Sequence, residues 1–247
     1  MSSESRARGF PAASPPDLHE IVIVVPAHNE RDRLPDCLDS IGVAARSVTV
    51  SVRVVVVLDT CTDGSESVLP PWVSAIRMSA RNVGAARAAG FVSAAPNADH
   101  RVWLATTDAD SVVPTTWLAD QIRHHRARMH GVVGTVAVDW REHATSTRRR
   151  YEGLYLTSEA DHHGHVHGAN LGVRADAYWR VGGFRPLSVG EDVDLVERLV
   201  SARTPLVWDA DNAVLTSDRR DSRARGGFGD YVRALADDDI GASAESA

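Results

Sequence analysis

The sequence predicts a single α/β domain in which helices flank a mixed, mostly parallel central sheet. Two short apolar runs rich in valine, at residues 21–27 (IVIVVPA) and 52–59 (VRVVVVLD), are typical of parallel strands that are buried on both faces. Segments with helical spacing follow them, so strand and helix alternate along the chain. The 247 residues, of which 43% are hydrophobic, are enough to bury one large core.

The expected elements follow one another in chain order. After the first strand, Leu34, Leu38 and Ile41 recur at helical spacing. The alanine-rich segment 84–95 is expected to form the next long helix, with Asn82 in position to cap it. Further expected elements are strands at 101–107, 131–140 and 205–209 and a helix through Tyr151 and Tyr155.

Both ends of the chain are expected to lie outside the folded domain. Residues 1–19 are rich in Ser, Pro, Ala and Arg and lack the apolar core of a secretory signal, so we expect a flexible leader. Residues 233–247 are acidic and are expected to form a flexible tail. No apolar run between them approaches the roughly 20 residues of a membrane-spanning helix.

Composition excludes several functions. The net charge is −6, and no basic stripe is interleaved with aromatic residues, which disfavours a nucleic-acid partner. Lysine is absent, which excludes Schiff-base catalysis and the Walker A loop, and no GxGxxG follows a strand. The two cysteines, Cys37 and Cys61, suit a reducing compartment, so we expect a cytoplasmic protein.

Polar residues follow the carboxyl ends of the first three predicted strands, where an open parallel sheet binds its ligand. They are His28, Asn29 and Glu30, then segment 59–65 (DTCTDGS), then segment 108–110 (DAD). Carboxylates gathered at one edge need a cation, and oxygen ligands favour Mg²⁺ or Mn²⁺ with substrate phosphates completing the shell. The alternative is that both acidic segments only form turns and solvated loops.

Five motifs occur in a fixed order along the chain. They are IVIVVPAHNE from residue 21, VVVVLDTCTDGS from 54, RNVGAARAAG from 81, TTDADS from 106 and GEDVDLVERL from 190. This series resembles the family 2 glycosyltransferases, whose Rossmann-like fold is called GT-A. The resemblance covers nearly the whole ordered chain and implies a nucleotide-sugar-binding half at 20–111 and an acceptor-binding and catalytic half at 112–232.

The resemblance implies a donor site for a nucleotide-diphosphate sugar. Asp110 is implied to bind the divalent cation, Mn²⁺ or Mg²⁺, that bridges the diphosphate. Arg219 and Arg220, in an arginine-rich segment, are expected to close over the diphosphate as a flap, the alternative being a solvated loop. The residues implied to line the donor site are Pro26, Ala27, Asn29, Glu30, Asp59, Asn82, Gly84, Arg87, Asp108, Ala109 and Asp110.

Catalysis is assigned by the same resemblance to the acidic pair of GEDVDLVERL. Asp192 is the candidate general base, and a single base with in-line attack predicts inversion of configuration. Glu191 is expected to orient the acceptor. The alternative is that the pair only caps a helix and complements its dipole, with Val193, Val196 and Val200 forming the apolar face of that helix.

The acceptor is expected to meet Trp140, His165, His167, Gly168 and Asn170. Four histidines between residues 162 and 167 raise the question of a zinc site, since alternating positions 163, 165 and 167 would share one face of a strand. No CxxC or HExxH accompanies them, and the carboxylates already account for a metal. We therefore expect the histidine segment to form a wall of the acceptor site. The late histidine that often completes the metal shell in the family is missing, and Ser217, Asp218 or water is expected to replace it.

Two functional hypotheses follow from the sequence. The first is an inverting, metal-dependent glycosyltransferase that acts on a hydroxyl acceptor, with no integral membrane segment and with peripheral membrane contact still open. The alternative is a nucleotide-sugar-binding pseudoenzyme, or a histidine-based metal-binding protein, that uses the same fold without turnover. A nucleotidyltransferase is disfavoured because its GGxGTRL opening is absent.

Overall fold

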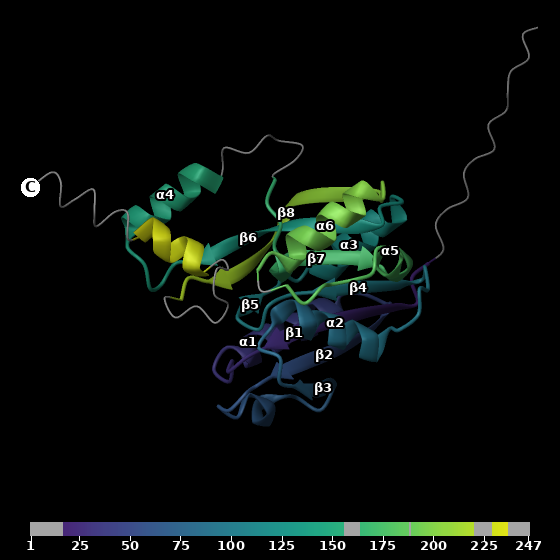
Figure 1. Ribbon diagram of the computed structural model, residues 1–247, viewed down its shortest axis with the longest axis horizontal. Coiled ribbons are helices and arrows are strands. Elements are labelled where there is room, and N and C mark those ends of the chain that lie inside the picture. The colour runs from purple at the N-terminus through teal and green to yellow at the C-terminus, as the bar shows by residue number, and fades with distance from the viewer. Residues whose placement is uncertain (1–16, 156–163, 188, 220–228, 237–247) are drawn as a thin grey trace, which may run out of the picture.

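The structure is a computed structural model, and it describes residues 17–155, 164–187, 189–219 and 229–236. These residues form one mixed, mostly parallel sheet of eight strands with helices on both faces, which confirms the predicted fold class (Figure 1). In the described part of the chain, no helix is long and apolar enough to cross a membrane. Residues 233–236, which the sequence places in the tail, are helical together with the described residues 229–232.

The first half of the chain builds one side of the sheet with parallel strands. Its elements are β1 (Glu20–Ala27), α1 (Leu34–Arg46), β2 (Ser51–Asp59), the 3₁₀ turn η1 (Ser65–Val68), β3 (Val73–Met78), α2 (Val83–Ala94) and β4 (Val102–Thr106). β1 pairs with β2 and β4, and β2 pairs with β3, all in parallel. Asn82 caps α2 as predicted, because its Oδ1 accepts the backbone N–H of Ala85 at 2.8 Å.

The second half adds strands of both directions. Its elements are β5 (Ser111–Val112), α3 (Trp117–Arg126), β6 (Gly131–Asp139), α4 (Thr145–Tyr155), the 3₁₀ turn η2 (Gly168–Asn170), β7 (Leu171–Arg174), α5 (Ala175–Arg180), α6 (Glu191–Ser201) and β8 (Leu206–Ser217). β7 is antiparallel to β4 and β6, whereas β8 is parallel to β6 and antiparallel to β5. The strand order is therefore β3-β2-β1-β4-β7-β6-β8-β5.

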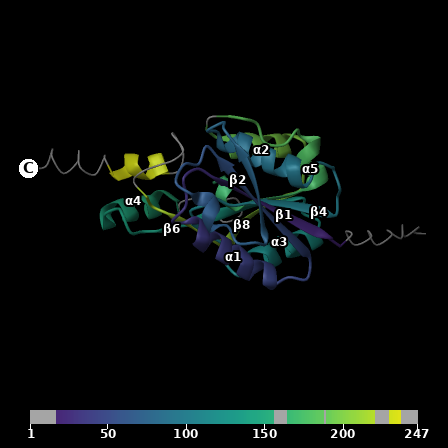
Figure 2. The same ribbon diagram turned by 90° about the horizontal axis from the view of Figure 1, so that it is seen from below.

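Each face of the sheet has its own core, because successive side chains of a strand point to opposite faces. In β1, Ile21, Ile23 and Val25 pack with α1 and α3, whereas Val22 and Val24 pack with the layer that contains α2, α5 and α6. Figure 2 shows the two helical layers on either side of the sheet. The rigid sheet places the carboxyl ends of β1, β2 and β4 side by side.

Some elements differ from the sequence-based expectation. The late strand extends to Ser217 instead of ending at 209, because β8 pairs with β6 on both sides of an irregularity in register. The buried face of α6 is Leu195, Val196 and Leu199, whereas Val193 and Val200 are exposed, so the apolar face expected from the three valines is wrong.

Candidate functional site

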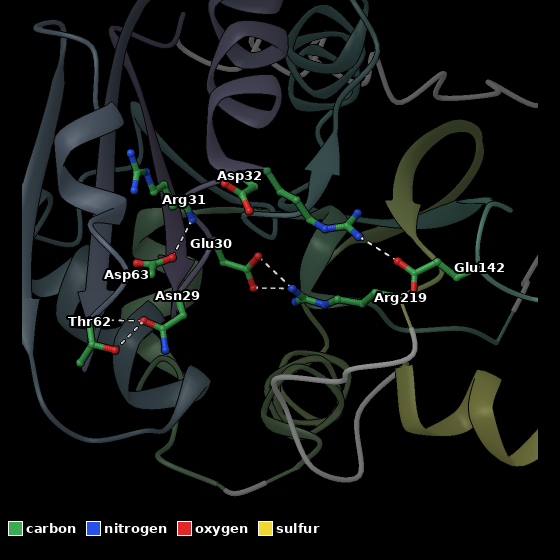
Figure 3. Close-up of a pocket in the computed structure, with 9 residues that line it drawn as sticks. Asn29, Glu30, Arg31, Asp32, Thr62, Asp63, Glu142 and Arg219 are labelled. Atoms are coloured by element: carbon green, nitrogen blue, oxygen red, sulfur yellow. Dashed lines mark hydrogen bonds and ion pairs between the residues drawn. The ribbon is translucent and has the colours of Figure 1, made fainter.

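A polar cavity of about 460 Å³ lies at the carboxyl ends of β1 and β2. Figure 3 shows its lining side chains, which come from the loops after these two strands, from the loop after β6 and from the end of β8. The lining residues are Asn29, Glu30, Arg31, Asp32, Arg33, Thr62, Asp63, Glu142 and Arg219. The sequence indicated Asn29, Glu30, Arg219 and, within segment 59–65, Thr62 and Asp63, whereas Glu142 lies in a loop without any motif and had no signal.

Side-chain hydrogen bonds join the loops after β1 and β2. Asn29 has a left-handed backbone (φ 57°), and its Oδ1 accepts the backbone N–H of Thr62 at 2.8 Å. Asp63 Oδ2 accepts the backbone N–H of Arg31 at 2.9 Å (Figure 3). The predicted turn role of TDGS and its place at the ligand edge are therefore compatible, because the turn itself builds the cavity wall.

Asp59, at the end of β2, organises the turn that leads into α2. Its carboxylate accepts the backbone N–H groups of Ala80, Arg81 and Asn82 at 2.8, 2.9 and 2.8 Å. Burial alone would raise the pKa of Asp59, but these backbone donors and the Thr60 hydroxyl outweigh it, so the pKa is lowered. Asp59 thus remains ionised and holds the turn in place.

Asp110 and Glu30 share one cationic partner, Arg219. Ser217 Oγ donates to Asp110 Oδ2 at 2.9 Å, and Arg219 Nη2 lies 3.0 Å from the same oxygen. Arg219 Nη1 contacts both carboxylate oxygens of Glu30, at 2.7 and 2.8 Å (Figure 3). Burial would lower the pKa of Arg219, but Asp110 and Glu30 outweigh it and raise that pKa. The guanidinium therefore stays charged between two acidic strand ends.

The residues around Asp110 fit a hard divalent cation that is completed by substrate oxygens. Oδ1 of Asp110 makes no hydrogen bond with any described residue. The Ser217 hydroxyl, which donates a hydrogen bond to Oδ2, lies beside the carboxylate and would offer a cation a neutral oxygen ligand. Within the described ranges, no three His, Cys, Asp or Glu residues could by themselves hold a metal ion. One carboxylate with phosphate oxygens and water is the usual environment of Mg²⁺ at phosphate sites.

Asp218, the other expected protein substitute, holds the loop after β6 in place. Its Oδ2 accepts three successive backbone N–H groups, from Arg141, Glu142 and His143, at 2.9, 2.8 and 3.0 Å. The side chain is 2% exposed, so this oxygen is committed to the loop after β6. Among the expected protein substitutes, Ser217 alone keeps its place beside Asp110.

Arg87 is a buried residue in the first two turns of α2, and it pairs with two carboxylates of the site. Its side chain is 3% exposed, and Nη2 pairs with Asp108 Oδ1 at 2.6 Å while Nη1 pairs with Glu191 Oε1. Nε donates to the Thr106 hydroxyl at 3.3 Å. Burial raises the pKa of Glu191, and the charge of Arg87 opposes that rise. The DAD segment and the acidic pair of α6, far apart in sequence, are thereby joined.

Asp192 is held by two backbone donors at the first turn of α6. Its Oδ2 accepts the N–H of Gly168 at 2.7 Å, and its Oδ1 accepts the N–H of Val193 at 2.9 Å. The contact with Gly168 connects the end of the histidine-containing segment to the acidic pair. Both carboxylate oxygens keep a lone pair for another donor, because an ionised carboxylate offers about four acceptor sites.

The remaining expected residues are placed in different surroundings. Ala27 and Ala109 are buried, Trp140 packs edge-on against Tyr151 with ring centroids 5.5 Å apart, and the His165 and His167 rings stack at 6.2 Å. Arg220, His162 and His163 lie outside the described residues.

Asn170 supports the core and does not face the cavity. Its Oδ1 accepts Trp117 Nε1 at 2.9 Å, and its Nδ2 donates to the carbonyls of Thr135 and Asn212 at 2.9 and 2.8 Å. The residue is 3% exposed. Its expected contact with an acceptor is therefore replaced by a positioning role for η2.

Gly84 allows α2 to approach the beginning of α6. A Cβ at this position would lie 2.3 Å from the carbonyl oxygen of Arg185 and 2.9 Å from Glu191 Cβ. We therefore expect Gly84→Ala to lower the free energy of unfolding by about 1–3 kcal/mol in urea denaturation, because backbone must move to admit the methyl group. Gly153→Ala is the matched control: it lies in α4, an added Cβ would meet no neighbouring side chain or element within 4 Å, and we expect it to be neutral or to stabilise by about 1 kcal/mol. Equal stability of the Gly84 variant and the wild type would contradict this close approach.

Comparison with known proteins is consistent with this geometry. Residues 22–182 match the family model described as Glycosyl transferase family 2. No curated protein sequence matches the chain. Among solved structures, the chain is similar to a fragment of S. aureus TarS (residues 1–349) in complex with UDP-GlcNAc, with a TM-score of 0.62 and 14% identity. It is also similar to the mannosyltransferase PcManGT from Pyrobaculum calidifontis in complex with GDP-Man and Mn²⁺, with a TM-score of 0.65 and 18% identity.

These structural matches extend over most of this chain but less of the other proteins. The match to TarS covers 87% of this chain and 65% of that fragment, and the match to PcManGT covers 88% and 62%. The chain thus spans just under two thirds of the length of each of these two structures. At these identities the similarity shows a common fold.

Proposed function

The chain belongs to glycosyl transferase family 2, and from that membership we propose that it transfers a sugar from a nucleotide-diphosphate sugar to an acceptor hydroxyl group. The observation that carries the proposal is the ion-paired cluster of Glu30, Asp110 and Arg219, of which Glu30 and Arg219 line the cavity, together with the bridge from Asp108 through Arg87 to Glu191 of α6. It supplies a diphosphate site and a carboxylate base at neighbouring strand and helix ends.

Donor binding is assigned to the cavity and its rim. The volume of about 460 Å³ suits a nucleotide, since ligand pockets typically measure roughly 300–1,000 Å³. We assign base and ribose to the loops of Asn29 and Thr62, and the diphosphate to the side of Asp110 and Arg219. A divalent cation bound to Asp110 would act as a Lewis acid for the leaving diphosphate. Arg219 would exchange its carboxylate partners for phosphate oxygens, which its guanidinium suits equally well.

Asp192 is assigned the role of general base. The acceptor oxygen attacks the anomeric carbon, its proton passes to the Asp192 carboxylate, and the bond from sugar to diphosphate breaks with its electron pair on the leaving diphosphate. The two N–H donors from Gly168 and Val193 orient the carboxylate for this transfer. One displacement with one base inverts the anomeric configuration. We place the reaction in the cytoplasm, with peripheral membrane contact open for a lipid acceptor.

The proposal is tested first by ligand-dependent stability. We expect UDP or GDP, or UDP-GlcNAc or GDP-mannose as intact donors, to raise the apparent Tm, and to raise it further with Mn²⁺. At 100 times Kd the expected stabilisation is about 2.7 kcal/mol. Inorganic phosphate with Mn²⁺ is the control and should leave the Tm almost unchanged. If none of the four nucleotides shifts the Tm of the folded protein, the donor site is wrongly assigned.

Measuring the release of nucleoside diphosphate distinguishes an active enzyme from a pseudoenzyme. An enzyme should release UDP or GDP from the donor that it binds, slowly by hydrolysis or faster with an acceptor. Binding without release from any donor, over a broad acceptor panel, would favour the pseudoenzyme. The histidine-based metal site is not favoured, because the family match covers most of the chain and identifies a glycosyl transferase.

A further inference from the structure

We propose that Arg87 is a positioning residue that couples the donor-binding loop after β4 to the catalytic end of α6, and that it does so without contacting the nucleotide. This inference rests on the proposed function, which assigns Asp108 to the donor side and Asp192 to the chemistry. It changes the expected role of Arg87, which the family resemblance places beside the nucleotide.

The guanidinium of Arg87 is enclosed by protein. A Cβ built on Gly168 would lie 2.3 Å from Nη2 and 2.4 Å from Cζ, so the backbone of η2 packs directly against the guanidinium. Phe184 contributes its ring face, with the centroid 5.6 Å from Cζ. With 2% of the residue exposed and Nε, Nη1 and Nη2 each paired, no surface of Arg87 remains for a phosphate.

The contacts of Arg87 belong to a closed ring. Nη1 pairs with Glu191, the first residue of α6, and the next residue, Asp192, accepts the N–H of Gly168. Gly168 packs back against the guanidinium, which completes the ring. A displacement of Arg87 therefore moves both anchors of the Asp192 carboxylate, namely the helix end and the Gly168 amide.

Two further contacts of the Arg87 guanidinium, with Asp108 and Thr106, connect this ring to the donor-binding loop after β4. Nη2 pairs with Asp108 at 2.6 Å, and Nε bonds the Thr106 hydroxyl at the end of β4. Arginine presents these donors in one rigid plane, whereas the lysine ammonium is a single point charge. A lysine at this position keeps the positive charge for Glu191 or for Asp108 but cannot hold both in the same geometry.

Arg87→Lys is the primary test, with Arg174→Lys as the matched control. Arg174 also forms a two-pronged pair with a carboxylate, to Asp176 at 2.5 and 2.8 Å, but lies on β7 where this strand pairs with the start of β4. For Arg87→Lys we expect faster amide hydrogen exchange both in segment 106–111 and in segment 185–195, with α1 unchanged. We expect kcat to fall about 100-fold, since a small misplacement of reacting groups has this effect, while Kd for UDP or GDP rises much less, because Arg87 itself does not contact the nucleotide. The control variant should show neither effect.

The outcomes separate this inference from the proposed function. A higher Kd for UDP or GDP with an unchanged kcat would show that Arg87 contacts the nucleotide and would overturn the inference. Faster exchange in only one of the two segments would also overturn it, because no coupling would exist. Should the wild type bind neither UDP nor GDP, the proposed function fails, but hydrogen exchange still decides the coupling.

A charge-balanced double variant covers the case in which Arg87→Lys does not fold. In Arg87→Met with Glu191→Gln, the cation and one buried carboxylate are removed together, so no new uncompensated charge remains at that pair. If Arg87 acts partly through Glu191, the loss of kcat in the double variant should be smaller than the product of the losses in Arg87→Met and Glu191→Gln. Independent, multiplying losses in kcat would contradict action through Glu191.

Discussion

Asp192→Asn is expected to lower kcat for sugar transfer by about 10²- to 10⁴-fold, the usual contribution of a positioned general base. The amide cannot take up the proton of the acceptor hydroxyl at neutral pH. The donor cavity lies at the ends of β1 and β2 and does not include Asp192, so Kd for the nucleoside diphosphate should stay close to that of the wild type. The measurement is release of nucleoside diphosphate at saturating donor, together with Kd from calorimetry.

The isosteric substitution also has a structural cost that must be separated from the chemistry. Both oxygens of Asp192 accept backbone N–H groups, and the asparagine NH₂ would face one of these donors. An unsatisfied contact of this kind costs about 1–3 kcal/mol of stability, so the Tm of the variant must be measured and the assay run well below it.

Asp194→Asn is the control for the alternative that the acidic residues of α6 only stabilise its N-terminus. Asp194 lies in the same first turn but pairs with Arg185 and Arg198, away from Gly168. If acidity at the helix end is all that matters, both variants should lose stability and keep kcat. A kcat that falls only with Asp192→Asn supports the base, and an unchanged kcat in both variants contradicts it.

The elements that the sequence predicted best are those with a local signal. The valine runs of β1 and β2 are continuous because both faces of these strands are buried, and Asn82 caps α2 through an oxygen three residues from its donor. Edge strand β3 escaped detection because Ser74, Ala75 and Arg77 are not buried and break the apolar run. Local patterns therefore identify central strands and caps more readily than edges.

The sequence predicted which acidic residues lie at the strand ends, but it did not predict which arginines pair with them. Asp108, Asp110 and Glu191 were recognised from motifs, yet their pairing with Arg87 and Arg219 depends on chain segments up to about one hundred residues apart. No spacing in the sequence encodes such contacts. The same reason applies to Asp218, whose carboxylate accepts backbone N–H groups of the loop from Arg141 to His143.

Asp110→Asn is expected to remove most of the dependence of turnover on Mn²⁺ and to lower kcat by about 10³-fold. The cation contributes several kcal/mol to stabilising the leaving diphosphate, and a neutral amide is a much weaker ligand than a carboxylate for a hard cation. The measurements are a Mn²⁺ titration of kcat and calorimetric Mn²⁺ binding to the complex with UDP or GDP. Ser217→Ala is the control, because it removes the hydroxyl beside Asp110 but keeps the carboxylate, and should have a smaller effect.

Arg219→Gln tests the same metal site with the opposite expected effect on Mn²⁺ binding. In the structure the guanidinium contacts Asp110 Oδ2 and Glu30, so it neutralises the carboxylate that would bind the cation. Without it, Mn²⁺ should bind the nucleotide-free protein more tightly, whereas UDP or GDP should bind more weakly because a phosphate partner is lost. If Asp110→Asn keeps the Mn²⁺ dependence of the wild type and Arg219→Gln does not change Mn²⁺ binding, Asp110 is not the metal ligand. Arg219 would then be the cation that faces the diphosphate.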